Sequence, residues 1–266
     1  MGIKAVEGHL KYLGLPTFVG RSKKQVFGFV QDRVWKKLKG WKEKLLSRVR
    51  KDVLIKAVVQ SIHTYIMGYF RLPTGLYNHI ASRINKFYWG SKDGEKKIHW
   101  IKWDKLYQSK QNGGLGFRDM EAFNMDLLAK QGWRLIKNSE SLAARTLSSR
   151  YYNRKDFLSS DVGFSPCFTW RSIWQAKCVL EKGECWRIRN GETVKIWKDP
   201  WLPKQNGSKP WSTSTTLNPN ARVAELMLEE EKEWNTDLIN QIFLPFEAQQ
   251  ILDIPIPSSN QVDCFY

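Results

Sequence analysis

Apolar residues recur at helical spacing along the first part of this chain. Between residues 22 and 39 the valines and Leu38 return at every fourth position, which predicts an amphipathic helix. Similar spacing predicts helices over residues 52–67 and 75–89, with Asp52 at the N-terminus of the first. Gly40 is expected to interrupt the helix predicted from residue 22 to about residue 39.

Helical spacing continues in the middle of the chain. It predicts a long helix over residues 119–137 and shorter helices over residues 142–151 and 170–180. A cluster of Asn and Gly at residues 112–116 breaks this pattern and predicts a turn before the long helix.

The hydrophobic period changes to alternation near residue 185. Apolar and polar residues alternate on both sides of Asn190 and Gly191, a favoured two-residue turn because both residues tolerate positive φ. This pattern predicts a β-hairpin over residues 185–197. Residues 203–220 have the composition of a linker, and two short helices are expected after it, over residues 223–228 and 234–243.

The predicted fold class is therefore mostly α with a small β part. An N-terminal segment with a small sheet contribution occupies residues 1–19, and a basic three-helix bundle occupies residues 20–90. A helical connection region that carries the hairpin follows over residues 91–203. Residues 204–266 are expected to form a linker and a loosely attached acidic C-terminal tail.

Composition and charge add a candidate partner. The chain has 266 residues, of which 42% are hydrophobic, and this is ample for a buried core. Its formal net charge of +17 is regional, because residues 1–111 carry 24 Lys and Arg against 7 Asp and Glu, whereas residues 205–266 carry 3 against 9. A basic region interleaved with aromatic residues is typical of proteins that bind the phosphates of nucleic acids.

The basic helices are the main candidate site. Residues 20–56 hold 13 Lys and Arg against 3 acidic residues. A solvated charged face, a membrane-surface helix and a calmodulin-target-like helix are the other interpretations. Phosphate binding is favoured because repulsion among these like charges must be offset by an anionic partner. The predicted nucleic-acid-binding residues are Lys11, Arg21, Lys23, Lys24, Arg33, Lys36, Lys37, Lys39, Lys42, Lys44, Arg48, Arg50 and Lys51.

The sequence suggests no catalytic residue, metal ligand or cofactor. The four Cys and four His lack zinc-ligand spacing, and neither GxSxG nor HExxH occurs. The glycine run at residues 112–116 is not a phosphate-binding loop, since it lacks GxxxxGK[ST]. No apolar run approaches the roughly 18 residues of a membrane-spanning helix, so we expect an intracellular protein that does not bind membranes.

Six ordered stretches carry a family resemblance. They are KYLGLPTFVGRSKK (11–24), WKKLKGWKEKLLS (35–47), VLIKAVVQSI (53–62), KKIHWIKWDKLYQSKQNGGLGFRD (96–119), FNMDLLAKQGWRL (123–135) and NGETVKIWKDPWLP (190–203). Together they resemble the region that follows the polymerase active site in plant LINE-type (non-LTR) retrotransposon reverse transcriptases. The chain is also similar to uncharacterised open reading frames of plant mitochondria.

The resemblance implies roles for several segments. Tyr12, Leu13, Gly14 and Leu15 would form a primer-grip-like strand-turn, a remnant of the end of the polymerase palm. The basic bundle would be the thumb, which follows the template–primer duplex, and residues 98–202 would connect it to a zinc-binding and ribonuclease H part. The implied partner is RNA or an RNA/DNA duplex.

Departures from the family pattern shape the functional expectation. The palm of the family carries adjacent Asp residues that hold Mg²⁺, and this chain has no adjacent Asp pair. We therefore expect a non-catalytic fragment that begins at an internal Met of the family's sequence, with Mg²⁺ needed only by the intact parent polymerase. The alternatives are part of an RNA-directed DNA polymerase whose palm is encoded upstream or supplied in trans, and a pseudogene product without function. Nuclear and mitochondrial locations both stay open, as does the oligomeric state.

Overall fold

The computed structural model is mostly helical, and each of its strands has two residues. It describes residues 11–17, 19–42, 46–90, 101, 103–153, 155–183, 185–203, 209–212, 217–228, 233–257 and 261–265. The predicted fold class, mostly α with a small β part, is confirmed. The chain divides into two compact units, Met1–Val179 (unit 1) and Leu180–Tyr266 (unit 2).

Unit 1 is built from helices after a short strand pair. Its elements are β1 (Lys11–Tyr12), β2 (Leu15–Pro16), α1 (Lys23–Val26), α2 (Gly28–Lys42), α3 (Arg48–Ala57), the 3₁₀ turn η1 (Val59–Ser61), α4 (Thr64–Met67), α5 (Thr74–Trp89), α6 (Trp103–Leu106), the 3₁₀ turn η2 (Lys110–Asn112), α7 (Met120–Lys137), α8 (Leu142–Leu147), the π-helical turn η3 (Ser148–Tyr152) and α9 (Phe168–Gln175). Helix α10 (Lys177–Gly183) runs across the boundary between the units.

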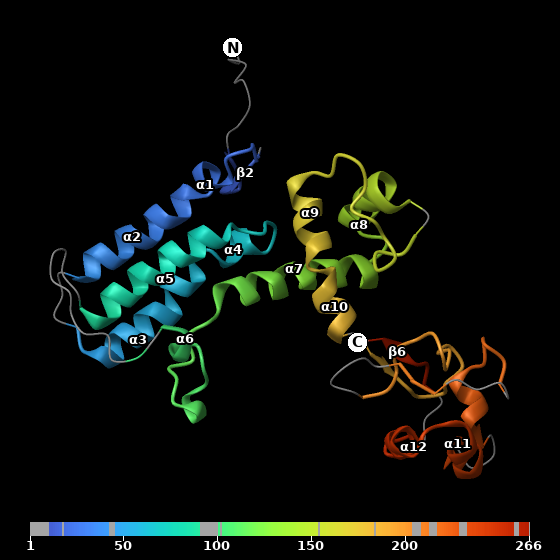
Figure 1. The fold of residues 1–266 in the computed structure, drawn as a ribbon. Coiled ribbons are helices and arrows are strands. Elements are labelled where there is room, and N and C mark those ends of the chain that lie inside the picture. The colour runs from blue at the N-terminus through green and yellow to red at the C-terminus, as the bar shows by residue number, and fades with distance from the viewer. Residues whose placement is uncertain are drawn as a thin grey trace. The chain divides into compact units, whose positions relative to one another are not determined.

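Helices α2, α3 and α5 form the basic bundle of unit 1. Helix α2 buries Val30, Val34 and Leu38, because residues four apart return to the same face. Helix α5 packs against both α2 and α3 and lies between them (Figure 1). Its Ile80 and Ile84 are fully buried in the same core. The cations of α2 and α3 are therefore carried by helices on two sides of α5.

The first predicted helix differs from the structure in two details. It is divided at Phe27, which lies in the core between α1 and α2. The prediction that Gly40 interrupts it is wrong, because α2 continues to Lys42. Leu38 and Trp41, on either side of the glycine, pack in the core. Their burial outweighs the cost of about 1 kcal/mol for a glycine inside a helix.

The second predicted helix, over residues 52–67, is wrong in its start and in its continuity. Helix α3 begins at Arg48, because the Ser47 hydroxyl accepts a hydrogen bond from the Arg50 amide at 3.4 Å. The helix ends at Ala57, and η1 and α4 follow as separate turns. The Ser61 hydroxyl donates to the carbonyls of Ala57 (3.0 Å) and Val58 (2.9 Å), and such local bonds compete with the regular hydrogen bonds of a helix.

Helices α5 and α7 confirm their predictions. Helix α5 ends at Gly90, whose φ of 70° is the left-handed conformation that favours glycine at a helix C-terminus. Helix α7 is capped by Asp119, whose Oδ1 accepts from the amides of Glu121 (2.9 Å) and Ala122 (3.3 Å). The helix predicted over residues 142–151 corresponds to α8 and η3, whereas the one over residues 170–180 is divided into α9 and α10.

The N-terminal strand-turn is present. Strands β1 and β2 pair antiparallel around Leu13 and Gly14, whose φ values of 49° and 80° form the tight turn. Leu15 packs against the core of the basic bundle, which anchors this segment to unit 1.

Unit 2 joins segments that lie far apart in the sequence. Its elements are β3 (Trp186–Arg187), the 3₁₀ turn η4 (Val223–Leu226), β4 (Met227–Leu228), β5 (Glu233–Trp234), α11 (Thr236–Ile242), α12 (Pro245–Leu252) and β6 (Cys264–Phe265). Strand β4 pairs with β5, and β3 pairs with β6 near the end of the chain. Both pairs are antiparallel.

The predicted β-hairpin over residues 185–197 is wrong. Strand β3 pairs with β6, and Lys195 forms an isolated bridge with Arg222. The reason is the carboxylate of Asp263, which accepts from the amides of Arg189 (2.7 Å), Gly191 (3.0 Å) and Thr193 (3.1 Å). These bonds wrap residues 189–193 around a single side chain, so Asn190 and Gly191 do not close a two-residue turn.

The expectation of a loosely attached tail is also wrong. Residues of the acidic segment share one hydrophobic core with residues 188–202. The fully buried Glu247, on α12, accepts from the amides of Trp211 (2.7 Å) and Ser212 (3.1 Å). The Ser212 hydroxyl also donates to Glu247 and accepts from the Leu244 amide at 2.9 Å. Sequence periodicity predicted neither α12 nor the hydrogen bonds of Glu247 with residues 211–212.

Across the described ranges, no helix combines the length and the apolar character that crossing a membrane requires.

Candidate nucleic-acid interface

Most of the predicted cations lie on the surface of the basic bundle and α1. Lys44 lies outside the described residues, and only the backbone of Lys11 is described. Lys51 is half-buried. The exposed cations are Arg21, Lys23, Lys24, Arg33, Lys36, Lys37, Lys39, Lys42, Arg48 and Arg50.

The apolar stripe of α2 determines where its cations point. Val30, Val34 and Leu38 face the core, and residues between them on the helix must face away from it. Lys36 and Lys39 lie nearly opposite the stripe, because successive residues are about 100° apart on a helix. The outer surface of α2 therefore carries exposed cations, among them Lys36 and Lys39.

The cations converge at one end of the bundle. Here the C-termini of α2 and α5 meet the N-terminus of α3, and the rings of Trp41 and Phe87 are 6.1 Å apart. The Lys51 ammonium lies 5.5 Å from the Phe87 ring centre, and the Arg48 guanidinium lies 5.5 Å from that of Trp89. Such cation–π contacts orient the side chains, which keep their positive charge.

Few acidic groups oppose these cations. Asp52 forms an ion pair with Lys56 at 3.0 Å, and Asp32 is the other acidic residue in the described part of α1 to α3. The first turn of α3 contains Arg48 and Arg50 and no acidic residue. A helix N-terminus carries partial positive charge, so Arg48 and Arg50 add to the positive potential at the start of α3.

Sequence reasoning missed some of the cations. Arg83, on α5, lies 4.3 Å from the ring centre of Trp35, on α2, so α5 contributes charge at the junction between these helices. Lys86 on α5 is also exposed. The apolar spacing of the third predicted helix could have identified them, since Arg83 and Lys86 lie outside the face that carries Ile80 and Ile84.

One predicted cation also has a structural contact. The Lys23 ammonium lies 4.7 Å from the ring centre of Phe168, on α9, and that ring stacks on Phe70 at 5.8 Å. Lys23 therefore links α1 to a packed aromatic group and is less available to a ligand than Lys24. In the primer-grip-like turn, Tyr12 is 67% exposed and Leu13 is 73% exposed.

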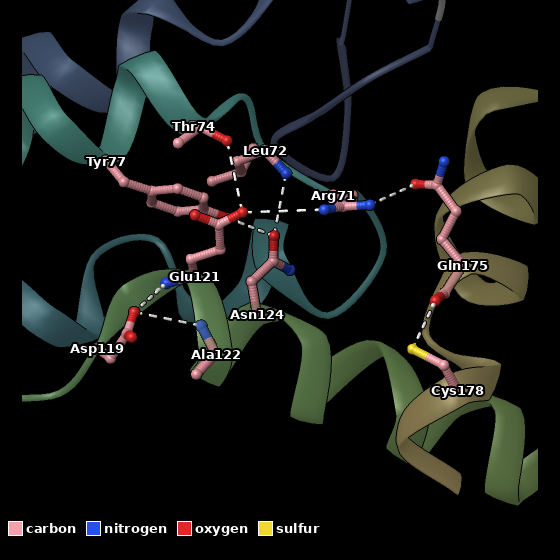
Figure 2. Close-up of polar contacts among 10 residues, drawn as sticks. All are labelled: Arg71, Leu72, Thr74, Tyr77, Asp119, Glu121, Ala122, Asn124, Gln175 and Cys178. Atoms are coloured by element: carbon pink, nitrogen blue, oxygen red, sulfur yellow. Dashed lines mark hydrogen bonds and ion pairs between the residues drawn. The ribbon is translucent and has the colours of Figure 1, made fainter. Parts of the chain in front are cut away.

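A buried amide joins the bundle to α7. Asn124 Oδ1 accepts from the Leu72 amide at 3.0 Å and from the Tyr77 hydroxyl (Figure 2). Its Nδ2 donates to the carbonyls of Met67 (2.6 Å) and Phe70 (3.1 Å). Burial, and then the nearby charge of Glu121, raises the pKa of Tyr77 well above its usual range, so the hydroxyl stays protonated and donates. The buried amide of Asn124 therefore holds residues 67–77 against α7.

Surface contacts extend this junction. Glu121 accepts from the Thr74 hydroxyl at 3.4 Å and pairs with Arg71 at 3.8 Å. Arg71 also donates to the Gln175 side chain at 3.2 Å (Figure 2). Helices α5, α7 and α9 are thereby connected through Arg71 and Glu121.

An open pocket of about 380 Å³ lies beside this junction, between α5 and the start of α7. Its two carboxylates already have roles, because Asp119 caps α7 and Glu121 binds Arg71 and Thr74. In the described part of the chain, no three His, Cys, Asp or Glu side chains lie close enough to hold a metal ion together. The pocket therefore offers hydroxyl and amide groups rather than a set of metal ligands.

Comparisons with known proteins identify relatives in plants. The chain matches no established family profile. It is 30% identical over 214 residues to the "Putative ribonuclease H protein At1g65750" of Arabidopsis thaliana, a match that covers 76% of this chain and 34% of that protein. The chain thus spans about a third of that relative's length.

A second relative is much shorter. The chain is 37% identical over 151 residues to the "Uncharacterized mitochondrial protein AtMg00310" of the same plant, covering 56% of this chain and 98% of that protein. The fold and its exposed cations define a mostly helical protein with a strongly basic N-terminal bundle. The chain belongs to the same family as this plant mitochondrial protein.

Proposed function

We propose that unit 1 binds RNA or an RNA/DNA duplex through phosphate contacts made by the basic bundle. The observation that carries this proposal is the row of exposed cations on α2 and α3, which only Asp32 and Asp52 oppose in the described part of α1 to α3. Each cation that contacts a phosphate releases a counterion, which favours binding. A duplex offers phosphates at regular spacing, so several helix-borne cations can be neutralised together.

The proposed origin is a plant non-LTR retrotransposon reverse transcriptase, of which the chain would contain the thumb and connection. Support comes from the six sequence stretches and from the relative named as a putative ribonuclease H protein. The name of the second relative favours mitochondria over the nucleus as the place of action.

A salt titration tests the binding proposal. Affinity for a 16-base-pair RNA/DNA duplex is measured by fluorescence anisotropy at several salt concentrations. We expect a steep loss of affinity with salt, because each phosphate contact contributes a log–log slope of roughly −0.9 on a duplex. Replacing Lys36, Lys37 and Lys39 together by Gln should make the slope shallower by about 2 to 3.

Charge removal elsewhere is the control. Lys182, Lys198 and Lys209 are exposed residues of unit 2, and their replacement by Gln removes the same three charges. This variant should keep the original slope. Absence of binding at low salt, or equal slopes in the two triple variants, would contradict the proposal.

We propose further that the chain does no chemistry by itself and needs no cofactor. The support is the absence of an adjacent Asp pair anywhere in the sequence, since the resemblance implies such a pair as the Mg²⁺ site of the polymerase. Primer extension by the purified chain with Mg²⁺ and nucleotides should give no product. Extension that disappears when a carboxylate of this chain is replaced would show instead that the chain is itself an enzyme.

A further inference from the structure

Two neighbouring tyrosines form an exposed aromatic pair in unit 1, outside the basic bundle. Tyr65, on α4, is 49% exposed, and Tyr69, in the turn that follows, is 37% exposed. Their ring centres are 5.5 Å apart and the ring planes cross at 73°. In this edge-on geometry one ring covers a single face of the other, so the pair itself leaves the remaining ring faces uncovered.

The backbone beneath the pair is fixed. Ile66 and Met67, between the tyrosines, are buried in the core. Gly68 is buried as well, and a Cβ there would lie 3.3 Å from the Tyr65 carbonyl oxygen and 3.8 Å from Gln131 Nε2. The turn therefore lies directly against α7, and the tyrosines are held on a rigid base.

The contact with α7 links the turn at Gly68 to a cation on that helix through Gln131. Gln131, which faces Gly68, accepts from Arg134 Nη1 at 3.3 Å through its side-chain oxygen. Arg134 is exposed, and that hydrogen bond is its one side-chain partner among the described residues. A guanidinium has five donors in a planar fork, so several stay available for a phosphate.

Exposed aromatic faces, with an exposed guanidinium on the helix against which their turn packs, fit a nucleotide better than a protein or a membrane. Unit 1 carries 34 Lys and Arg against 13 Asp and Glu, which favours a polyanion. Bases within a duplex are already stacked on each other, whereas an unpaired base has a face that can stack on a tyrosine. We propose that Tyr65, Tyr69 and Arg134 form a stacking site for an unpaired nucleotide of a single-stranded overhang. This inference rests on the proposed function and specifies the form of its substrate.

The test compares two probes that differ only in an overhang. One is a blunt RNA/DNA duplex, and the other is the same duplex with five unpaired RNA nucleotides. The overhang should raise the affinity of the unaltered chain at least about fivefold, since stacking of one base on an aromatic ring contributes that much or more. The double variant Tyr65→Ala/Tyr69→Ala should lose this preference and keep its affinity for the blunt duplex.

Further variants separate stacking from charge. Tyr65→Phe/Tyr69→Phe keeps the rings and should keep the preference. Phe164→Ala removes a fully exposed ring from the loop before α9 and should also keep it. The alanine pair should leave the salt slope for the overhang probe nearly unchanged, because stacking releases no counterions, whereas Arg134→Gln should make it shallower by about 0.7.

A measurement on the unaltered chain does not depend on variant folding. An overhang that contains 4-thiouridine is crosslinked by light, and the modified peptide is found by mass spectrometry. A crosslink within residues 65–69 is expected, and one found only elsewhere overturns the stacking site. If the blunt duplex binds and the overhang adds no affinity, the stacking site is wrong while the proposed function stands. If neither probe binds at low salt, both are wrong.

Discussion

Units 1 and 2 use buried polar side chains in opposite ways. In unit 1 the central polar group is Asn124, a neutral amide that joins the bundle to α7 with four hydrogen bonds. In unit 2 the carboxylates of Asp263 and Glu247 organise loops by accepting backbone amides. The amide joins two parts of unit 1 without adding a negative charge there, and Asp32 and Asp52 are the acidic residues in the described part of α1 to α3. In unit 2, by contrast, the carboxylates of Asp263 and Glu247 are themselves part of the folded structure.

The largest expected effect on stability comes from removing the buried amide of Asn124 in unit 1. Asn124→Ala would leave two buried carbonyls, the Leu72 amide and the Tyr77 hydroxyl without their partner, and it would open a cavity. We expect a loss of about 3 to 5 kcal/mol in the free energy of unfolding of unit 1, because each buried unpaired group costs roughly 1 to 3 kcal/mol and neighbouring groups relax together. Hydrogen exchange of peptides from α5 and α7 measures it.

The exposed Asn78, also on α5, provides the control. Asn78→Ala should change stability by less than about 0.5 kcal/mol, as is usual for surface positions. Peptides from α11 and α12 should exchange as before in both variants. Equal losses in the two units would show that Asn124 does not act within unit 1 alone.

A smaller effect is expected for the carboxylate of unit 2. Asp263→Ala removes the acceptor of three backbone amides and of the Thr193 hydroxyl, at 2.9 Å. We expect unit 2 to lose about 2 to 3 kcal/mol, since the hydrogen bonds of Arg189 and Thr193 are only partly buried, whereas those of Asn124 are all buried. The same exchange measurement should show faster exchange in peptides from residues 185–202. Duplex binding by unit 1 should not change, and a marked loss of binding would contradict the separation of roles.

These two residues also show what the sequence could predict. Asn124 lies on a helix that periodicity identified correctly, yet nothing local distinguishes it from a surface asparagine. Asp263 is more than 60 residues from its partners, so the hairpin predicted around Asn190 and Gly191 followed local turn preferences that a distant carboxylate overrides. The cations of α2 were predictable because the apolar stripe alone determines their face.

The sequence pattern also did not predict the proposed stacking site. Tyr65 falls within the helix predicted over residues 52–67, and Tyr69 lies two residues beyond its end, so the apolar spacing did not single out the pair. Helix α3 ends at Ala57 and η1 follows it, so the residues of α4 and of the next turn do not continue the spacing of α3. A 3₁₀ turn of three residues shifts every following side chain, and no periodicity rule anticipates it.

A third expected effect is a loss of stability of unit 1 at acidic pH. Burial lowers the pKa of His63 to about 4 from its ordinary 6.5, and its Nδ1 has no hydrogen-bond partner among the described residues. Because the unfolded chain takes up the proton more readily, the stability of unit 1 is complete above about pH 6.5 and falls as the pH drops toward 4. Between pH 7 and pH 5 the loss should be about 2 kcal/mol.

Urea unfolding at the two pH values measures this loss. His63→Leu removes the titrating group and should flatten the difference between pH 7 and pH 5 by about 2 kcal/mol. His79→Gln removes an exposed imidazole from α5 and is the control. An unchanged pH profile in His63→Leu would mean that other groups cause the acid sensitivity.

The smallest expected effect compares one glycine from each unit. Gly40 lies inside α2, and a Cβ there would meet no atom within 4 Å, whereas a Cβ at Gly191 would lie 2.5 Å from the Ala224 amide nitrogen. Gly40→Ala should therefore stabilise unit 1 by roughly 0.5 to 1 kcal/mol. Gly191→Ala should destabilise unit 2, because its φ of 69° is also unfavourable for alanine. Thermal unfolding of both variants measures the difference. A destabilising Gly40→Ala would contradict the open surroundings of this position within unit 1.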